Sequence, residues 1–85
     1  MKPYGIRLTR EAVKDFDKLT PKLQRKLAEI LTRSISPDPW CGKRLVGDLT
    51  GFYSFHLTYK DRIGYSVNEP SRTVFVHRVR THYGD

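Results

Sequence analysis

The chain has 85 residues, the length of one small domain, and we expect a single domain over residues 1–85. Hydrophobic residues make up 38% of the sequence and charged residues 29%, a balance that excludes a disordered chain. The formal net charge of +7 favours polyanionic partners, such as nucleic acid or an acidic protein, over a membrane surface. A solvated basic surface without a partner is the alternative.

The sequence has none of the signals of a secreted or membrane-inserted protein. Cys41 is the only cysteine, so no disulfide can form within the chain, and the opening residues MKPYGIRLTR lack the apolar core of a signal peptide. No segment approaches the ~18 apolar residues that a membrane-spanning helix requires. We therefore expect a cytoplasmic protein that does not bind a membrane.

The first half of the chain predicts a short strand and two helices. Residues 4–8 alternate between apolar and polar positions, as in a strand. Thr9 is a candidate N-cap for a helix over residues 10–19. The apolar face of this helix is predicted to hold Ala12, Val13, Phe16 and Leu19, and its polar positions Glu11, Lys14, Asp15 and Lys18.

A second helix is predicted from Pro21, with Thr20 as its N-cap, because proline at the first helical position loses no hydrogen bond. Its buried stripe is formed by Leu23, Leu27, Ile30 and Leu31. The prolines and the glycine of SPDPWCG, residues 36–42, require the helix to end and a loop to follow.

The second half predicts antiparallel strands. Residues 52–59 alternate, with Tyr53, Phe55, Leu57 and Tyr59 on one face and Ser54, His56 and Thr58 on the other. After a turn near Lys60 and Asp61, a second strand continues the apolar face with Ile63, Tyr65 and Val67. A third strand covers residues 73–80 after the NEPSR turn, and its VFV run, apolar on both faces, places it inside the sheet.

These elements predict an α+β fold: a strand, two helices and an antiparallel meander of three or more strands, with the helices on one face of a twisted sheet. The opposite face would be open. The alternation points four polar side chains toward this open face: Ser54, His56, Arg62 and Ser66. A shift of one residue at a turn would move the side chains of a strand to the opposite face.

The open face offers groups for metal-independent cleavage of RNA. Such a reaction needs a base for the ribose 2′-OH, a cation for the charge that grows on the phosphate, and an acid for the leaving 5′-oxygen. Arg62 is a planar cation suited to phosphate, and His56 and His82 titrate near neutral pH. Tyr83 can stack on a base or donate its hydroxyl. Each residue alone has an ordinary structural explanation, and only their convergence on one face indicates a site.

Other chemistries are less well supported. Cys41, His56, His77 and His82 are metal-binding residue types, but no two of them have the usual ligand spacing. His77 lies inside an apolar run, which favours a structural, hydrogen-bonded role. The sequence also has no Gly-rich phosphate loop. We therefore expect neither a metal nor a cofactor.

The segment RLVGDLTGFYSFHLTYKDRIGYSV, residues 44–67, resembles the core signature of the RelE/ParE superfamily of bacterial toxins. The ending RTHY, residues 80–83, is similar to that of the YoeB/Txe branch. The resemblance covers essentially the whole chain and implies a microbial-RNase-like fold. It also implies a toxin of a type II toxin–antitoxin pair, which cleaves mRNA in the ribosomal 30S A site by attack of the 2′-OH and leaves a cyclic phosphate.

The resemblance assigns phosphate binding to Arg62 and active-site roles to His82 and Tyr83. Lys43 stands where the YoeB branch has a glutamate that is thought to act as the general base. With Arg44 beside it, the chain is locally more similar to the RelE branch, which places basic residues around the phosphate.

The general base must therefore be sought elsewhere, and we expect it at His56 or at His82, with Asp48 as a weaker candidate. The basic residues expected to contact RNA or the ribosome are Lys43, Arg44, Arg78 and Arg80.

Two alternatives remain open: a ParE-like inhibitor of DNA gyrase without nuclease activity, and a non-catalytic basic RNA-binding domain. Arg62, His82 and Tyr83 favour the nuclease, because gyrase inhibition requires no such group. The expected partners are the ribosome with its mRNA and a cognate antitoxin, whose acidic and partly disordered segment would fold onto this basic chain. A dimer and a toxin–antitoxin heterocomplex are both compatible with the sequence.

Overall fold

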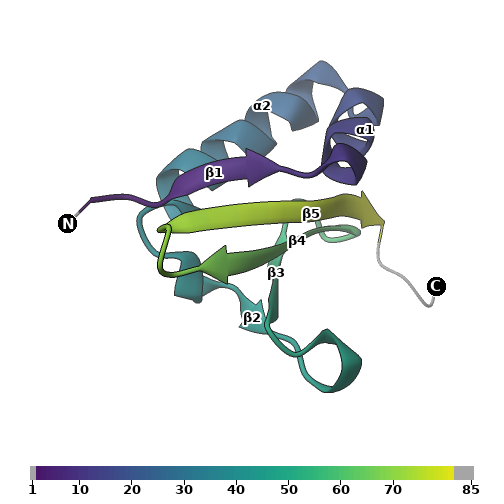
Figure 1. The fold of residues 1–85 in the computed structure, drawn as a ribbon. Coiled ribbons are helices and arrows are strands. Elements are labelled where there is room, and N and C mark those ends of the chain that lie inside the picture. The colour runs from purple at the N-terminus through teal and green to yellow at the C-terminus, as the bar shows by residue number, and fades with distance from the viewer. Residues whose placement is uncertain (1, 82–85) are drawn as a thin grey trace.

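The computed structural model describes residues 2–81 and places two helices against one face of a five-stranded sheet (Figure 1). The elements, in chain order, are β1 (Gly5–Leu8), α1 (Arg10–Lys18), α2 (Pro21–Ile30), β2 (Lys43–Arg44), β3 (Phe52–His56), β4 (Asp61–Asn68) and β5 (Thr73–Thr81). The strand order is β1-β5-β4-β3-β2. β1 runs parallel to β5, and the other neighbouring strands are antiparallel. The predicted α+β fold, with the third predicted strand inside the sheet, is confirmed.

Both helices begin at the predicted caps. The Thr9 hydroxyl accepts a hydrogen bond from the Ala12 N–H at 3.2 Å, and the Thr20 hydroxyl accepts one from the Leu23 N–H at 3.3 Å. Each bond satisfies a backbone donor that has no partner within its helix. After Ile30, α2 continues as a wider π-helical turn over Leu31–Ile35.

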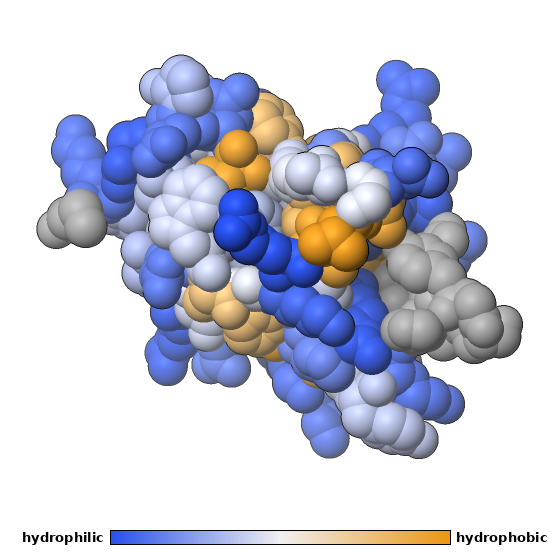
Figure 2. Space-filling model, turned by 90° about the horizontal axis from the view of Figure 1, so that it is seen from below, coloured by the Kyte–Doolittle hydropathy of each residue, from blue (hydrophilic) through white to orange (hydrophobic). Residues whose placement is uncertain are grey.

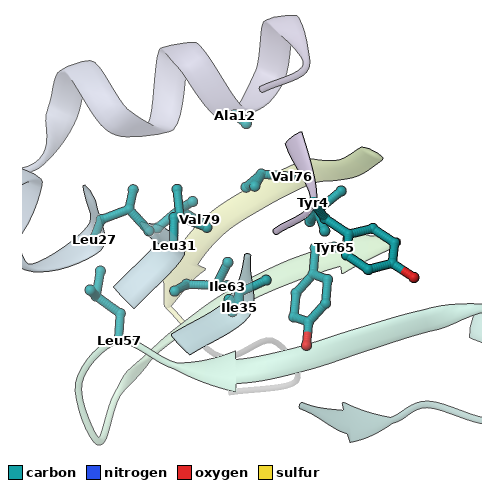
Figure 3. Packing of buried hydrophobic residues seen from close by; sticks show 11 residues of the cluster. Tyr4, Ala12, Leu27, Leu31, Ile35, Leu57, Ile63, Tyr65, Val76 and Val79 are labelled. Atoms are coloured by element: carbon teal, nitrogen blue, oxygen red, sulfur yellow. The ribbon is translucent and has the colours of Figure 1, made fainter. Parts of the chain in front are cut away.

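The hydrophobic core lies between the helices and the sheet (Figure 3). Leu27 and Ile35 reach it from α2 and its extension, while Ile63, Tyr65 and Val76 reach it from β4 and β5. All five side chains are fully buried or nearly so. Since Ile63 and Tyr65 alternate along β4, the intervening residues of that strand face the other side of the sheet.

The predicted polar face of α1 is wrong at one position. Asp15 is only 7% exposed, whereas Val13, which was expected on the apolar face, is 45% exposed. β1 ends at Leu8, so the part of β5 beyond Val76 has no neighbouring strand on that side and is covered by α1 instead. The Asp15 carboxylate accepts a hydrogen bond from the Val79 N–H at 2.9 Å and so satisfies a donor of that uncovered edge.

The strand predicted over residues 52–59 ends early, at His56. Thr58 then organises a tight turn, because its hydroxyl accepts hydrogen bonds from the N–H groups of Lys60 and Asp61. Tyr59 is therefore 85% exposed and does not lie on the core face, as its alternation had suggested. Local side-chain to backbone bonding at a threonine competes with the ladder of the sheet.

Tyr65 fixes the loop that leads into β2. Its buried hydroxyl donates to the Pro39 carbonyl at 2.8 Å and accepts from the Gly42 N–H at 3.1 Å. A Cβ atom on residue 42 would lie 2.3 Å from this oxygen, so only glycine fits there. The hydroxyl thus holds the residue that immediately precedes Lys43.

Tyr65→Phe is expected to lower the free energy of unfolding by about 1–3 kcal/mol, because the carbonyl of Pro39 and the N–H of Gly42 lose their buried partner. Urea unfolding followed by circular dichroism measures the change. Tyr59→Phe removes the same hydroxyl from an exposed ring and should leave the unfolding midpoint unchanged. Equal midpoints for the two variants would contradict the assigned role of the Tyr65 hydroxyl.

Candidate functional site

A pocket of about 300 Å³ opens on the face of the sheet that the helices leave free. It is lined by Lys43, Leu45, Leu49, Phe52, Ser54, Arg62, Gly64, His77 and Arg78. On the side of the molecule away from the helices, hydrophobic patches lie beside strongly hydrophilic residues (Figure 2). The volume suffices for a small planar ring or one nucleotide unit.

The register of the sheet explains which side chains meet in the pocket. Ser54 of β3 lies between Lys43 of β2 and Gly64 of β4, so these three residues form a row across the strands. Gly64 has no side chain, and this absence deepens the hollow at the centre of the row. Arg62, two residues before Gly64 on β4, points to the same face.

Arg62 is held by His56, its direct partner on β3. The Arg62 Nη1 lies 2.8 Å from the His56 Nε2. A guanidinium can only donate, so Nε2 must be the acceptor and the imidazole must be neutral, with its proton on Nδ1. Protonation of His56 would remove this acceptor and place two cations side by side.

The Nε of Arg62 is buried and has no hydrogen-bond partner among residues 2–81. A buried donor without an acceptor is unfavourable by roughly 1–3 kcal/mol. Nη1 contacts His56, and the guanidinium itself lines the pocket, where an anion can approach its cationic plane.

A bulge in β5 brings His77 and Arg78 to the pocket together. Gly64 of β4 pairs with Arg78, whereas the next residue, Tyr65, pairs with Val76, so β5 carries one extra residue at this point. Both Val76 and Val79 therefore reach the core, and the two residues between them line the pocket.

His77 is half-buried in the pocket wall. Its Nε2 lies 2.8 Å from the Ser66 hydroxyl, and its ring centroid is 4.9 Å from that of Phe52, with 59° between the ring planes. Burial lowers the pKa of His77 below its ordinary value of 6.5. The imidazole is therefore neutral at pH 7.

The guanidinium of Arg78 turns from the pocket rim toward α1. Its Nε and Nη2 donate to the two carboxylate oxygens of Asp15, at 2.9 and 3.2 Å. This bidentate pair compensates much of the positive charge of Arg78. Among the described cations that line the pocket, Arg78 is thus the one most constrained by the fold.

Comparison with solved structures identifies the family. A chain of the RelBE2 toxin–antitoxin complex from Mycobacterium tuberculosis is 30% identical to this chain. The match covers 96% of this chain and 94% of that one, with a TM-score of 0.87. The chain belongs to the RelE/ParE superfamily of toxins.

Two further solved structures are similar to this chain. A chain of the YoeB–YefM complex from Staphylococcus aureus is 25% identical, with a TM-score of 0.77, and the match covers 94% of this chain and 98% of that one. The RelBE complex from E. coli shares the fold, with a TM-score of 0.80 at 21% identity over 93% of this chain and 96% of that one. No family model matches the sequence, and neither does any curated protein.

The structure brings part of the predicted site of this RelE/ParE protein together. Arg62 and Lys43 line the pocket, and His56 lies beside it as the partner of Arg62. Arg44 is exposed and follows Lys43 on β2, so its side chain points to the other face of the sheet. His82 and Tyr83 lie outside the described residues, and Arg80 is placed only by its backbone, opposite Arg62.

The apolar floor of the pocket and the place of His77 in its wall were not predicted from the sequence. Leu45, Leu49 and Phe52 form the floor, and the loop residues among them show no periodic pattern. One sequence feature could have indicated this floor: Phe52 is an apolar residue that shares the alternation of the polar Ser54 and His56 on β3. His77 is hydrogen-bonded as expected, but it also lines the pocket, on the face opposite to that of the buried Val76.

Asp48, the weaker base candidate of the sequence, does not line the pocket. Within residues 2–81, no group of three or more His, Cys, Asp or Glu side chains is arranged to hold a metal ion. None of the helices in that same range is both long and apolar enough to cross a bilayer.

Proposed function

We propose that residues 1–85 form a single toxin domain that acts as a ribosome-dependent, metal-independent mRNA endonuclease. The ribose 2′-OH would attack the adjacent phosphorus in the ribosomal A site and leave a cyclic phosphate. Belonging to the RelE/ParE superfamily supports the toxin role, and the chemistry of the pocket supports the nuclease. As the toxin of a type II pair, the protein would block translation in the cytoplasm.

One observation carries the nuclease proposal: the pocket combines cations with an apolar floor. Lys43, Arg62 and Arg78 line it, and none of its described lining residues is acidic. A nucleotide has the complementary character, since its phosphate is anionic and its base is planar and apolar on both faces.

The geometry suggests a division of roles. Arg62 would neutralise the charge that grows on the phosphate, with His56 as the residue that positions its guanidinium. Lys43 would contact a phosphate from the pocket rim, and Arg44, Arg78 and Arg80 would contact other parts of the RNA or ribosome. His82 and Tyr83, which the family resemblance places in the active site, would supply the acid and a stacking ring.

A cognate antitoxin is the second proposed partner. The RelBE2 and YoeB–YefM structures are toxin–antitoxin complexes, and the charge of +7 on this chain suits an acidic partner segment. Binding of such a segment over the cationic pocket would exclude RNA from it. Co-expression with the adjacent reading frame should therefore relieve growth inhibition.

Filling the pocket tests the proposal directly. Gly64→Val should lower the rate of mRNA cleavage on programmed ribosomes by about 100-fold, because the added side chain displaces RNA from its productive position. A Cβ at residue 64 would lie 3.8 Å from the Arg78 carbonyl oxygen, an ordinary contact, so we expect the fold to persist. Primer extension on the mRNA measures the cuts.

Gly5→Val is the matched control. A Cβ at residue 5 would also lie 3.8 Å from a carbonyl oxygen, that of Arg72, on a strand that does not line the pocket. Cleavage by this variant should equal that of the wild type. Broken DNA with intact mRNA in cells would instead indicate a gyrase inhibitor, and RNA binding without cuts would indicate a non-catalytic domain.

A further inference from the structure

His77 lines the pocket from β5, next to the bulge of that strand. His77 follows the core residue Val76, so the alternation of β5 points it to the open face, and the bulge between the pairs Gly64–Arg78 and Tyr65–Val76 places Arg78 beside it. The Thr9 hydroxyl donates to the His77 carbonyl at 3.1 Å and anchors the bulged backbone from the α1 side.

The surroundings of His77 hold its ring in one orientation. Phe52 packs against one side at a centroid distance of 4.9 Å, and the Ser66 hydroxyl lies 2.8 Å from Nε2. The hydroxyl oxygen can accept the proton of Nε2. In that tautomer, Nδ1 carries the free lone pair that a proton transfer needs.

The position of His77 in the pocket wall favours a neutral imidazole, because burial lowers its pKa. Lys43 faces the pocket from β2, Arg62 from β4 and Arg78, paired with Asp15, from β5, and no described lining residue is acidic. The ring is thus in its basic form at the pH of the cytoplasm.

The other described lining residues are not suited to accept a proton. Lys43, Arg62 and Arg78 are cations at neutral pH, and Ser54 does not titrate in that range. His56 lies beside the pocket, but the lone pair of its Nε2 is occupied by Arg62 at 2.8 Å. His77 is therefore the described pocket residue that combines a neutral ring with an uncommitted nitrogen.

We propose that His77 is the general base of the reaction, an inference that rests on the proposed RNA cleavage. Its Nδ1 takes the proton of the 2′-OH as the 2′-oxygen forms a bond to phosphorus. The bond from phosphorus to the 5′-oxygen breaks, and that oxygen takes a proton from a separate acid. The products are a 2′,3′-cyclic phosphate, a 5′-hydroxyl and an imidazolium that returns its proton to solvent.

The pH dependence of single-turnover cleavage tests this role. The wild-type rate should rise tenfold per pH unit on the acid side, where His77 becomes deprotonated, and then level off. His77→Gln, which can still hydrogen-bond to Ser66, should be about 100-fold slower at pH 7 and should lose this slope. His56→Gln should also be slower, but it should keep the slope.

Two measurements separate this role from its alternatives. An mRNA whose leaving 5′-oxygen is replaced by sulfur needs no acid, so His77→Gln should remain slow on it. Full recovery on that substrate would make His77 an acid, and a slope lost in His56→Gln but retained in His77→Gln would make His56 the base. Either result overturns the proposal.

A test without activity uses the free protein. Long-range ¹H–¹⁵N spectra should show His77 with its proton on Nε2 and a pKa below that of a histidine in a short peptide. A proton on Nδ1 would overturn the proposal even if the protein cleaves mRNA. If the wild type does not cleave mRNA although its spectra agree, the proposed function fails while the state of His77 stands.

Discussion

Replacing Arg62 with alanine is expected to slow mRNA cleavage by about 100- to 1,000-fold without unfolding the protein. The guanidinium lies in the pocket and is oriented by His56 at 2.8 Å, so it is ready to neutralise the phosphate before the substrate arrives. Groups positioned in advance stabilise growing charge most effectively, because they need not reorganise during the reaction. Single-turnover cleavage on programmed ribosomes measures the loss.

Two further variants and a melting temperature show whether the slower cleavage comes from the missing guanidinium. Arg33→Ala removes the same charge from an exposed helix position and should cleave like the wild type. Arg62→Lys keeps the charge but not the planar fork, so its rate should fall between those of the wild type and Arg62→Ala. The melting temperature of Arg62→Ala should be unchanged or higher, since the variant no longer buries an unpaired Nε. Wild-type cleavage by Arg62→Ala would exclude the proposed phosphate site.

Much of the fold could be predicted from the sequence because its signals are local. Thr9 and Thr20 cap their own helices through bonds three residues ahead, and Pro21 marks the first turn of α2. The alternation of β4 likewise separates Ile63 and Tyr65 in the core from Arg62 on the open face. Each of these choices depends on neighbours within a few positions.

The features that sequence reasoning missed depend on distant partners. Asp15 has the polar character of a solvent-facing helix residue. It is buried because β1 ends at Leu8, so the N–H of Val79 has no strand partner and donates to the Asp15 carboxylate instead. The position of Arg78 depends on a bulge, which breaks the period of two on which strand assignments rest. His77 reaches the pocket by the regular alternation from Val76, whereas Arg78 reaches it through the bulge and is then fixed by Asp15.

Among the charged residues of the helices, Asp15 should therefore be the one whose replacement lowers the free energy of unfolding most. Asp15→Ala is expected to lower the free energy of unfolding by about 3–5 kcal/mol, since it removes the acceptor of the Val79 N–H and the carboxylate that pairs with Arg78. Small domains have a total stability of roughly 5–15 kcal/mol, so a large share of it would be lost. Urea unfolding at pH 7 measures the effect.

Asp17→Ala is the control, because it removes the same charge from an exposed position two residues along α1 and should change the unfolding free energy little. Asp15→Asn keeps an acceptor for the Val79 N–H but loses the charge, so its free energy of unfolding should lie between those of Asp15→Ala and Asp17→Ala. The double variant Asp15→Ala/Arg78→Ala should lose less stability than the sum of its single changes, since both single changes remove the same ion pair. Strict additivity would show that the pair does not act as a unit, and the rigid placement of Arg78 at the pocket would then need another cause.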